Sequence, residues 1–276
     1  MPAERGIKMK CFTLHSYKGG TGKTTIAANL AVMLSQMGRN VALLDLDFQA
    51  PSLHTLFGIR PQTTYINAYL AQEKTPKEVL VDLAPSLKLK GRLLVGFSDP
   101  NVEAIRSQLA RDRKWHMQAL SQLLNLKVRL QAEGADYMIL DSAPGVHYSS
   151  VNAIVLSDFT VIVAKIDNFD FDGTVNVLDG LYTPLNKPTL LLFNKVVPAL
   201  LEEPRYSQVR KTIEDTFSSK TKLMGFIPCY CDIALGMGSE IHALTQPKIP
   251  FVQSLKKMAT ILEKWPGPQG TAKGGT

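Results

Sequence analysis

The chain has 276 residues, 45% hydrophobic and 20% charged, a composition typical of a soluble globular protein. It contains no run of 18 or more apolar residues, which excludes a membrane-spanning helix, and its polar first ten residues resemble no export signal. Three cysteines are too few for a disulfide framework and favour a reducing cytosol. The net charge of +7 favours nucleic acid or anionic lipid as a partner, although part of the excess could serve nucleotide phosphates.

Short apolar runs alternate with longer amphipathic segments between residues 8 and 265. This alternation predicts an α/β fold: a doubly wound, mostly parallel sheet of about seven or eight strands flanked by helices. We expect strands at residues 11–15, 41–46, 92–97, 137–140, 159–164, 189–193 and 223–227. We expect helices at residues 23–37, 101–109, 115–132, 174–181, 207–218 and 251–264. Residues 8–265 are therefore expected to form one domain, followed by a disordered tail at 266–276.

Residues 16–25 carry the most specific motif, Ser-Tyr-Lys-Gly-Gly-Thr-Gly-Lys-Thr-Thr. The motif follows an expected strand and opens an expected helix, which is the context that a phosphate-binding loop requires. Its glycines let successive backbone N–H groups turn toward phosphate oxygens, and the positive end of the helix adds to that field. The residues expected to bind the nucleotide are Gly19, Gly20, Thr21, Gly22, Lys23, Thr24 and Thr25. Lys23 would reach the β- and γ-phosphates, Thr24 would ligate Mg²⁺, and Thr25 could bond the α-phosphate.

Acidic residues follow two other expected strands. Asp45 and Asp47 lie at the end of the 41–46 strand, on the same side of the chain, and would face the ligand crevice. The alternative for this pair is a helix N-cap. Asp141 ends the apolar segment 137–140, the Walker B arrangement in which a carboxylate beside the phosphate loop holds Mg²⁺.

The form Lys18-Gly-Gly-x-Gly-Lys23-Thr resembles the deviant Walker A loop of the MinD/ParA ATPases. Their relatives include the Mrp-type carriers and the ATPases that target tail-anchored proteins. The resemblance implies that Lys18 reaches across a homodimer interface to the phosphates of ATP bound by the partner. A cation supplied in this way neutralises charge that builds during phosphoryl transfer. The alternative for Lys18 is an ordinary surface lysine.

The same resemblance implies further roles at the strand ends. Asp47 would orient the attacking water in switch I, and Asp45 would support Mg²⁺ or the loop. The segment 141–145, Asp-Ser-Ala-Pro-Gly, resembles switch II, in which Gly145 would sense the γ-phosphate. Asn194 would contact the adenine edge, and Pro228 would end the strand that packs under the purine. The family commonly continues Ile-Pro-x-Asp at this point, whereas this chain continues Cys-Tyr-Cys-Asp.

Cys229 and Cys231 lie two residues apart directly after the last expected strand. A homodimer would bring four thiolates together, a set that suits zinc. Some relatives in nickel insertion and iron–sulfur assembly carry paired cysteines, but this spacing differs from the Cys-Pro-x-Cys of Mrp-type carriers. Two half-buried structural cysteines are the favoured interpretation, and metal or cluster delivery is the alternative.

Two segments bear on docking surfaces. The helix expected at 251–264 has an apolar stripe flanked by lysines, which could bind a membrane surface but is more simply the last helix covering the sheet. Residues 86–114 carry seven Lys and Arg against three acidic residues. This cluster could be a solvated face or a docking patch for polyanions.

Together these motifs predict an enzyme that hydrolyses ATP to ADP and phosphate, with Mg²⁺ as cofactor. The family resemblance implies monomers that form an ATP-bound sandwich dimer, an activating protein partner, and a role in positioning or partitioning cargo. We expect the protein in the cytoplasm, docked on nonspecific DNA of the nucleoid or on the anionic inner membrane. A metabolic kinase or synthetase is a weaker alternative, because no small-substrate motif is evident.

Overall fold

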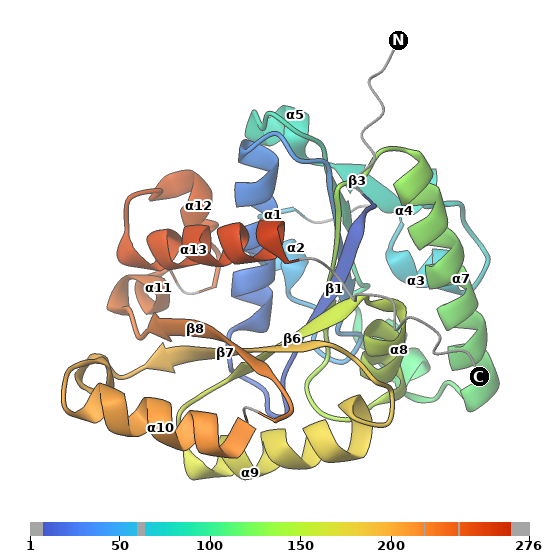
Figure 1. Ribbon diagram of the computed structural model, residues 1–276. Helices are drawn as coiled ribbons and strands as arrows, with labels where there is room; N and C mark the ends of the chain where they lie inside the picture. The colour runs from blue at the N-terminus through green and yellow to red at the C-terminus, as the bar shows by residue number, and fades with distance from the viewer. Residues whose placement is uncertain (1–7, 60–63, 218, 237, 266–276) are drawn as a thin grey trace, which may run out of the picture.

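The computed structural model describes residues 8–59, 64–217, 219–236 and 238–265. Within these residues, eight strands form one sheet in the order β3-β4-β2-β5-β1-β6-β7-β8 (Figure 1). The strands are β1 (Lys10–His15), β2 (Val41–Leu46), β3 (Leu80–Asp82), β4 (Leu93–Gly96), β5 (Tyr137–Ser142), β6 (Phe159–Ala164), β7 (Thr189–Val196) and β8 (Lys222–Pro228). Only β3 runs antiparallel to its described neighbour, so the expected fold class is confirmed.

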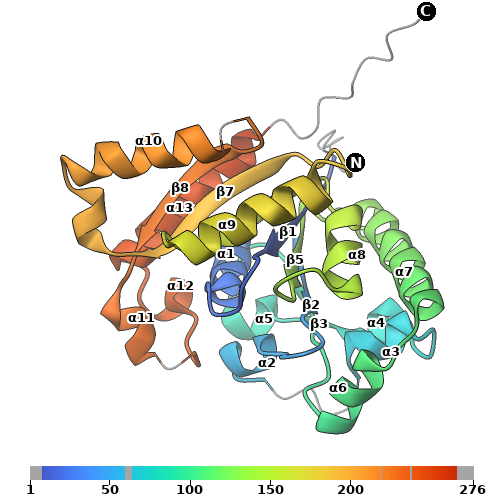
Figure 2. The same cartoon turned by 90° about the horizontal axis from the view of Figure 1, so that it is seen from below.

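Helices connect the strands and cover both faces of the sheet (Figure 2). The longer helices are α1 (Lys23–Gln36), α6 (Val102–Leu109), α7 (Arg113–Ala132), α8 (Tyr148–Leu156), α9 (Asn168–Val177), α10 (Arg205–Phe217) and α13 (Pro250–Lys264). The short ones are α2 (Leu53–Leu56), α3 (Ile66–Leu70), α4 (Pro76–Val79), α5 (Ala84–Leu87), α11 (Cys231–Leu235), α12 (His242–Thr245), the π-helix η1 (Leu178–Tyr182) and the 3₁₀-helix η2 (Pro198–Leu201). None of the described helices is long and apolar enough to cross a bilayer.

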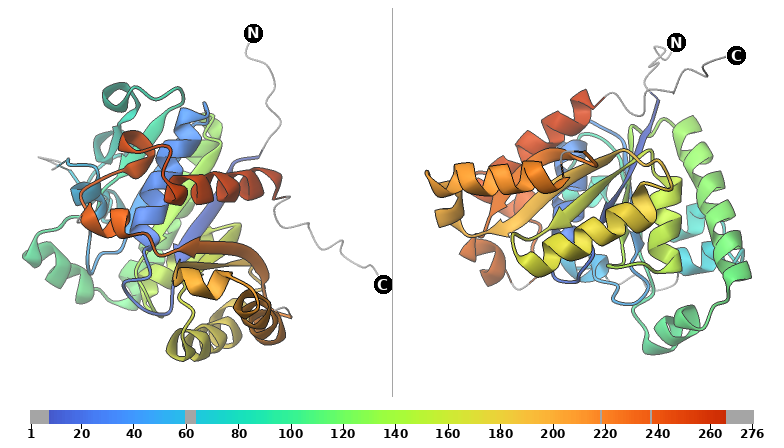
Figure 3. Two further views of the ribbon diagram at one scale, coloured as in Figure 1. Left: turned by 90° about the vertical axis from the view of Figure 1, so that its left-hand side faces the viewer. Right: turned by 60° about the horizontal axis from the view of Figure 1, so that its bottom comes forward.

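The strands bury alternate side chains in two layers of core. Phe12 and Leu14 of β1 belong to the cluster that α1 and α13 cover, whereas Cys11 faces the cluster that α7 and α8 cover. Burial on both faces explains why the central strands are continuous apolar runs in the sequence. Helices α9 and α10 cover the β6–β8 part of the sheet, and α13 packs against α1 on the opposite face (Figure 3).

Three expectations about individual elements need correction or comment. The helix expected at 174–181 begins earlier, at Asn168, because the Asp167 side chain accepts the Asp170 N–H at 2.8 Å and caps its first turn. Helix α8 and the three-residue strand β3 were not expected. The apolar stripe of α13, from Phe251 to Leu262, is buried against the sheet, so core packing is confirmed for that stripe. The tail expected at 266–276 lies outside the described residues.

Candidate functional site

The phosphate-loop motif joins β1 to α1 at the carboxyl edge of the sheet. Gly20 and Gly22 have φ of 74° and 92°, the left-handed region that glycine adopts without strain. Gly22 also lies directly before the first turn of α1, so the loop leads without a break into the N-terminus of this helix. A Cβ placed on Gly22 would lie 2.5 Å from Nδ2 of Asn194. Any side chain at this position would therefore push Asn194 away from the loop.

Lys23 lies at the floor of the loop with only 6% of its surface exposed. Its Nζ donates a hydrogen bond to Oγ of Ser16 at 2.8 Å, and Ser16 in turn donates to the carbonyl oxygen of Lys18 at 2.5 Å. Burial lowers the pKa of Lys23, while the carboxylates of Asp141 and Asp47 act to raise it. The result is a preformed cation beneath the loop whose charge faces two acids.

Asp45 and Asp141 pair in register at the ends of β2 and β5, and each is 1% exposed. Asp45 accepts the backbone N–H groups of Asp47 at 3.1 Å and Leu53 at 3.4 Å. Burial, followed by the charges of Asp141 and Asp47, raises the pKa of Asp45 well above its usual value. Burial also raises the pKa of Asp141 to about 7, although Thr24 and Lys23 act to lower it.

This donor set fits a divalent cation. Both carboxylate oxygens of Asp141 are buried, and neither has a hydrogen bond of normal geometry to any described residue. Thr24, in the first turn of α1, lies close enough to lower the pKa of that carboxyl group, and the Asp47 carboxylate lies near enough to raise it. Hard oxygen ligands of this kind suit Mg²⁺, and a cation would relieve the repulsion between the acids.

Gly145, the expected switch II glycine, is held at both of its backbone polar groups. Its N–H donates to the carbonyl oxygen of Ser16 at 2.8 Å. Its carbonyl oxygen accepts from Oγ of Ser150 at 2.8 Å and lies 2.9 Å from Nε2 of His15. With φ of 72°, Gly145 adopts a conformation that other residues rarely reach. The segment expected to form switch II is therefore bonded directly to the strand end that precedes the phosphate loop.

Lys18 lies apart from the buried lysine. Its Nζ is 4.7 Å from the centroid of the Phe169 ring, at the start of α9, and that ring is 76% exposed. The ring of the preceding Tyr17 packs on the same helix, so that a Cβ placed on Gly173 would clash with Cδ1 of Tyr17. The first part of the loop thus rests on α9, with its lysine at the rim of the site.

The strand ends β7 and β8 close the other side of the loop. Asn194 donates from Nδ2 to the carbonyl oxygen of Thr21 at 2.7 Å, and Lys195 donates to that of Gly20 at 3.0 Å. Asn194 therefore braces the loop backbone, a contact that the motif did not indicate. Lys195 was not expected at the site, although its place beside Asn194 at a strand end was the available signal. Pro228 ends β8, half-buried.

Cys229 and Cys231 are free thiols, and both are exposed. The expectation of half-buried structural cysteines is therefore wrong, because the chain turns outward after β8 and α11 begins at Cys231. Among the described residues of one chain, no group of three or more His, Cys, Asp or Glu side chains is arranged to hold a metal ion. A site built on these thiols would need ligands from a second copy.

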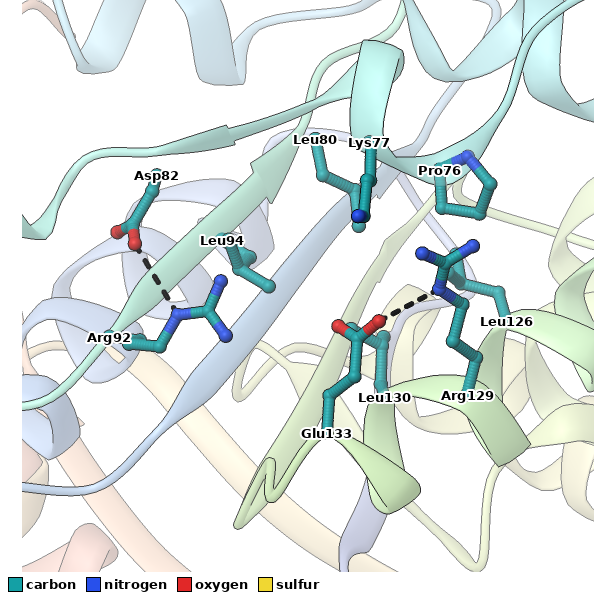
Figure 4. A pocket seen from close by; sticks show the side chains of 10 residues that line it. All are labelled: Pro76, Lys77, Leu80, Asp82, Arg92, Leu94, Leu126, Arg129, Leu130 and Glu133. Carbon is teal, nitrogen blue, oxygen red and sulfur yellow. Dashed lines mark hydrogen bonds and ion pairs between the residues drawn. The ribbon is translucent and has the colours of Figure 1, made fainter.

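A separate cavity of about 490 Å³ lies between β3, β4, α4 and α7 (Figure 4). Leu80, Leu94 and Leu126 are among the apolar side chains that line it. Two of its three cationic side chains are engaged, since Arg92 pairs with Asp82 at 3.4 Å and Arg129 pairs with Glu133 at 2.8 Å, and Lys77 is the third. No residue expected to bind the nucleotide lines this cavity, so it is distinct from the loop site.

A glycine loop between a parallel strand and a helix, with acids at adjacent strand ends, defines a P-loop nucleotide-binding protein. Residues 12–235 match the family described as the CobQ/CobB/MinD/ParA nucleotide binding domain, and the chain belongs to this family. The P-loop ATPases of the MinD/ParA group are members of it.

The relatives include proteins of three named kinds. The sporulation initiation inhibitor Soj of Bacillus subtilis is 28% identical over 174 residues, covering 62% of this chain and 64% of Soj. An iron–sulfur cluster carrier of Clostridium perfringens is 29% identical over 180 residues, covering 62% of this chain and 57% of the carrier. The solved structure of the septum site-determining protein MinD of Pyrococcus horikoshii with Mg-ADP matches with a TM-score of 0.72 and 19% identity, covering 93% of this chain and 96% of MinD. The chain thus aligns with less than two thirds of the length of these sequence relatives.

Proposed function

We propose that this chain is an ATP-driven switch, in which Mg-ATP joins two copies and hydrolysis to ADP and phosphate separates them. The observation that carries the proposal is the contrast between the two lysines of the loop. Lys23 is buried beneath the loop beside Asp141, whereas Lys18 lies at the rim against an exposed ring. This contrast supports the proposal that Lys23 serves the chain's own nucleotide and that Lys18 serves a neighbour's.

Different residues of one chain would bind the phosphates, hold Mg²⁺ and orient the attacking water. The loop backbone from Gly19 to Thr25 and the helix N-terminus would hold the phosphates, and Lys23 would contact the β- and γ-phosphates. Thr24 and Asp141, supported by Asp45, would hold Mg²⁺, which neutralises charge on the phosphate oxygens. Asp47 would orient the attacking water. Its Oδ1 now accepts the N–H groups of Gln49 and Ala50 at 3.2 and 3.1 Å, so its carboxylate is already oriented by the backbone.

In the dimer, Lys18 would leave Phe169 and contact the phosphates bound by the partner. A cation over an exposed ring contributes about 0.5–1 kcal/mol, so this contact is weak enough to exchange for a phosphate. The phosphate offers a full charge in a site from which the second copy excludes water, where electrostatic attraction is stronger. Nucleotide binding and dimer formation are thereby coupled.

We further propose that the switch positions or partitions cargo in the cytoplasm, on the nucleoid or the inner membrane surface. Nonspecific DNA and anionic lipid are both candidate docking surfaces. Four exposed cations lie on α6, in the turn after it and at the start of α7, which supports a polyanion partner: Arg106, Arg111, Arg113 and Lys114. An activating protein would then set the rate of hydrolysis, as the family resemblance implies.

Phosphate release measured over a range of protein concentrations tests this function. If the active site is shared, the activity per chain should rise with protein concentration until the dimer saturates, and it should require Mg²⁺. The Lys23→Ala protein provides the background rate. Activity per chain that is constant from nanomolar to micromolar protein would contradict a shared site.

Metal or iron–sulfur cluster delivery is a second candidate, favoured by the exposure of Cys229 and Cys231 and by the relative named as a cluster carrier. Two copies would offer four thiolates to one ion or cluster. The test is to load the protein with Zn²⁺ or an iron–sulfur cluster and count bound metal per dimer. The Cys229→Ser/Cys231→Ser protein should lose this metal, and Cys11→Ser, at the buried third cysteine, is the matched control.

A further inference from the structure

A buried chain of hydrogen bonds connects switch II to the π-helix η1 through β1. The hydroxyl of Tyr182, the last residue of η1, lies 2.6 Å from Nδ1 of His15. Nε2 of the same imidazole lies 2.9 Å from the carbonyl oxygen of Gly145. Tyr182 and His15 are 2% and 0% exposed. The ring therefore bridges a tyrosine hydroxyl and a backbone group of the switch without contact with solvent.

The chemistry of the three groups fixes the direction of both bonds. A carbonyl oxygen can only accept, so Nε2 of His15 carries the hydrogen that Gly145 receives. Burial lowers the pKa of His15 to about 4, so the ring is neutral and Nδ1 keeps a lone pair. Burial also raises the pKa of Tyr182 well above its usual value, and its hydroxyl donates to Nδ1. The Gly145 carbonyl thus sets the tautomer of His15, and the Tyr182 hydroxyl, which could donate or accept, donates to Nδ1.

The proposed switch requires Gly145 to move. Its N–H is now committed to the carbonyl oxygen of Ser16 at 2.8 Å, and it must leave that oxygen to meet a γ-phosphate. The carbonyl of the same residue is held by His15 and by Ser150, so rotation about Gly145 strains those bonds. The bonds to His15 and Ser150 therefore stabilise the conformation in which the Gly145 N–H is bonded to Ser16 and is not free for a γ-phosphate.

The placement of Tyr182 depends on an unusual backbone. Helix α9 does not end in a regular turn but continues as a π-helix from Leu178 to Tyr182, a feature often found at functional sites. The same α9–η1 segment carries Gly173, which accommodates Tyr17, and Phe169, which contacts Lys18. Residues 15, 17 and 18 of the loop region are thus contacted by one continuous helical segment.

We infer that Tyr182 and His15 are positioning residues that hold switch II in the conformation in which Gly145 is bonded to Ser16, and so set the preference of the site between ADP and ATP. The inference rests on the proposed function, because it needs Gly145 to sense the γ-phosphate. Removal of the buried hydrogen bond between Tyr182 and His15 should raise the preference of the site for ATP over ADP about three- to tenfold. A merely structural role would lower stability and leave that ratio unchanged.

The test compares affinities for Mg-ADP and for a non-hydrolysable Mg-ATP analogue. The Tyr182→Phe protein removes only the hydroxyl, and its affinity ratio should shift about three- to tenfold toward the ATP analogue. The matched control is Tyr69→Phe, which removes a buried tyrosine hydroxyl that donates to the carbonyl oxygen of Gln122 at 2.8 Å, outside the switch. Its ratio should stay at the wild-type value.

A second pair of variants distinguishes the loss of a hydrogen bond from the loss of the folded structure. His15→Gln retains an amide N–H that can serve the Gly145 carbonyl, and its ratio should shift less than that of His15→Leu. A Tyr182→Phe protein that unfolds cooperatively and binds both nucleotides with the wild-type ratio would overturn the inference and leave the proposed function standing. A wild-type protein that binds neither nucleotide would instead overturn the proposed function, and the inference with it.

Discussion

Asp45 at the end of β2 lies opposite Asp141 on the neighbouring strand β5, and both carboxyl groups are buried. Burial is the main reason that the pKa of each is raised, to about 7 for Asp141. Two adjacent buried carboxylates repel each other, so their ionised state is unfavourable until a proton or a cation is added. A bound cation would relieve this repulsion, and the raised pKa values make folding depend on pH.

The nucleotide-free, metal-free protein should lose stability as the pH rises. The pKa of Asp141 is about 7 in the folded chain, above the value of 3.8 for an unperturbed carboxyl. Its contribution is therefore full below about pH 4 and is lost as the pH rises through about 7. Chemical denaturation between pH 5 and 8 should show a smaller decline for Asp141→Asn than for wild type. Equal declines in the two proteins would contradict this assignment.

Replacement of Lys23 by methionine should separate folding from nucleotide binding. The lysine is buried and burial lowers its pKa, so an apolar side chain of similar length should keep the folded protein at least as stable. Loss of the charged hydrogen bonds to phosphate should weaken ATP binding about 10- to 100-fold. Titration with a fluorescent ATP analogue and thermal unfolding measure the two effects. Unchanged ATP affinity would remove Lys23 from the phosphate site.

Replacement of Lys18 by alanine should leave nucleotide binding to the single chain within about twofold, since only a surface contact is lost. Hydrolysis should fall by about 10³-fold or more, the range typical of a cation supplied in trans. Lys90→Ala, at an exposed lysine remote from the loop motif, is the control. Steady-state phosphate release gives the rates. A Lys18→Ala protein with wild-type turnover would show that this lysine is an ordinary surface residue.

Two glycines of the α9–η1 segment test the contact between this segment and the loop. A Cβ on Gly173 would clash with the Tyr17 ring, so Gly173→Ala should destabilise the protein by about 1–3 kcal/mol. A Cβ on Gly180 meets no atom within 4 Å, so Gly180→Ala should be neutral or stabilising by up to about 1 kcal/mol. Denaturant unfolding compares the two. Equal effects would mean that Tyr17 does not pack on Gly173.

Elements with a strong local signal could be predicted from the sequence. The buried parallel strands at 41–46 and 159–164 agree with the structure at both ends. Each is apolar except for one residue, Asp45 or Thr160, and such runs indicate burial on two faces. The phosphate loop was predictable because glycine spacing, lysine and helix start agree. The side-by-side placement of Asp45 and Asp141 followed from both acids lying at carboxyl ends of parallel strands.

Features that depend on distant contacts could not be predicted in this way. Strand β3 has three residues, none fully buried, and it forms only because β4 offers an edge. The bond between His15 and Tyr182 joins residues 167 positions apart, and nothing in either segment signals it. Asn194 was expected at the base, but its amide reaches the loop carbonyl of Thr21 because β7 brings it there. Its contact with adenine remains a prediction.

The mass of the Asp47→Ala protein in solution, by size exclusion with light scattering, tests the central claim most directly. If Asp47 orients the attacking water, this variant should hold ATP unhydrolysed and elute as a dimer with Mg-ATP and as a monomer with Mg-ADP. The Lys18→Ala/Asp47→Ala protein should be monomeric with either nucleotide. Elution of Asp47→Ala as a monomer at saturating Mg-ATP would contradict the account.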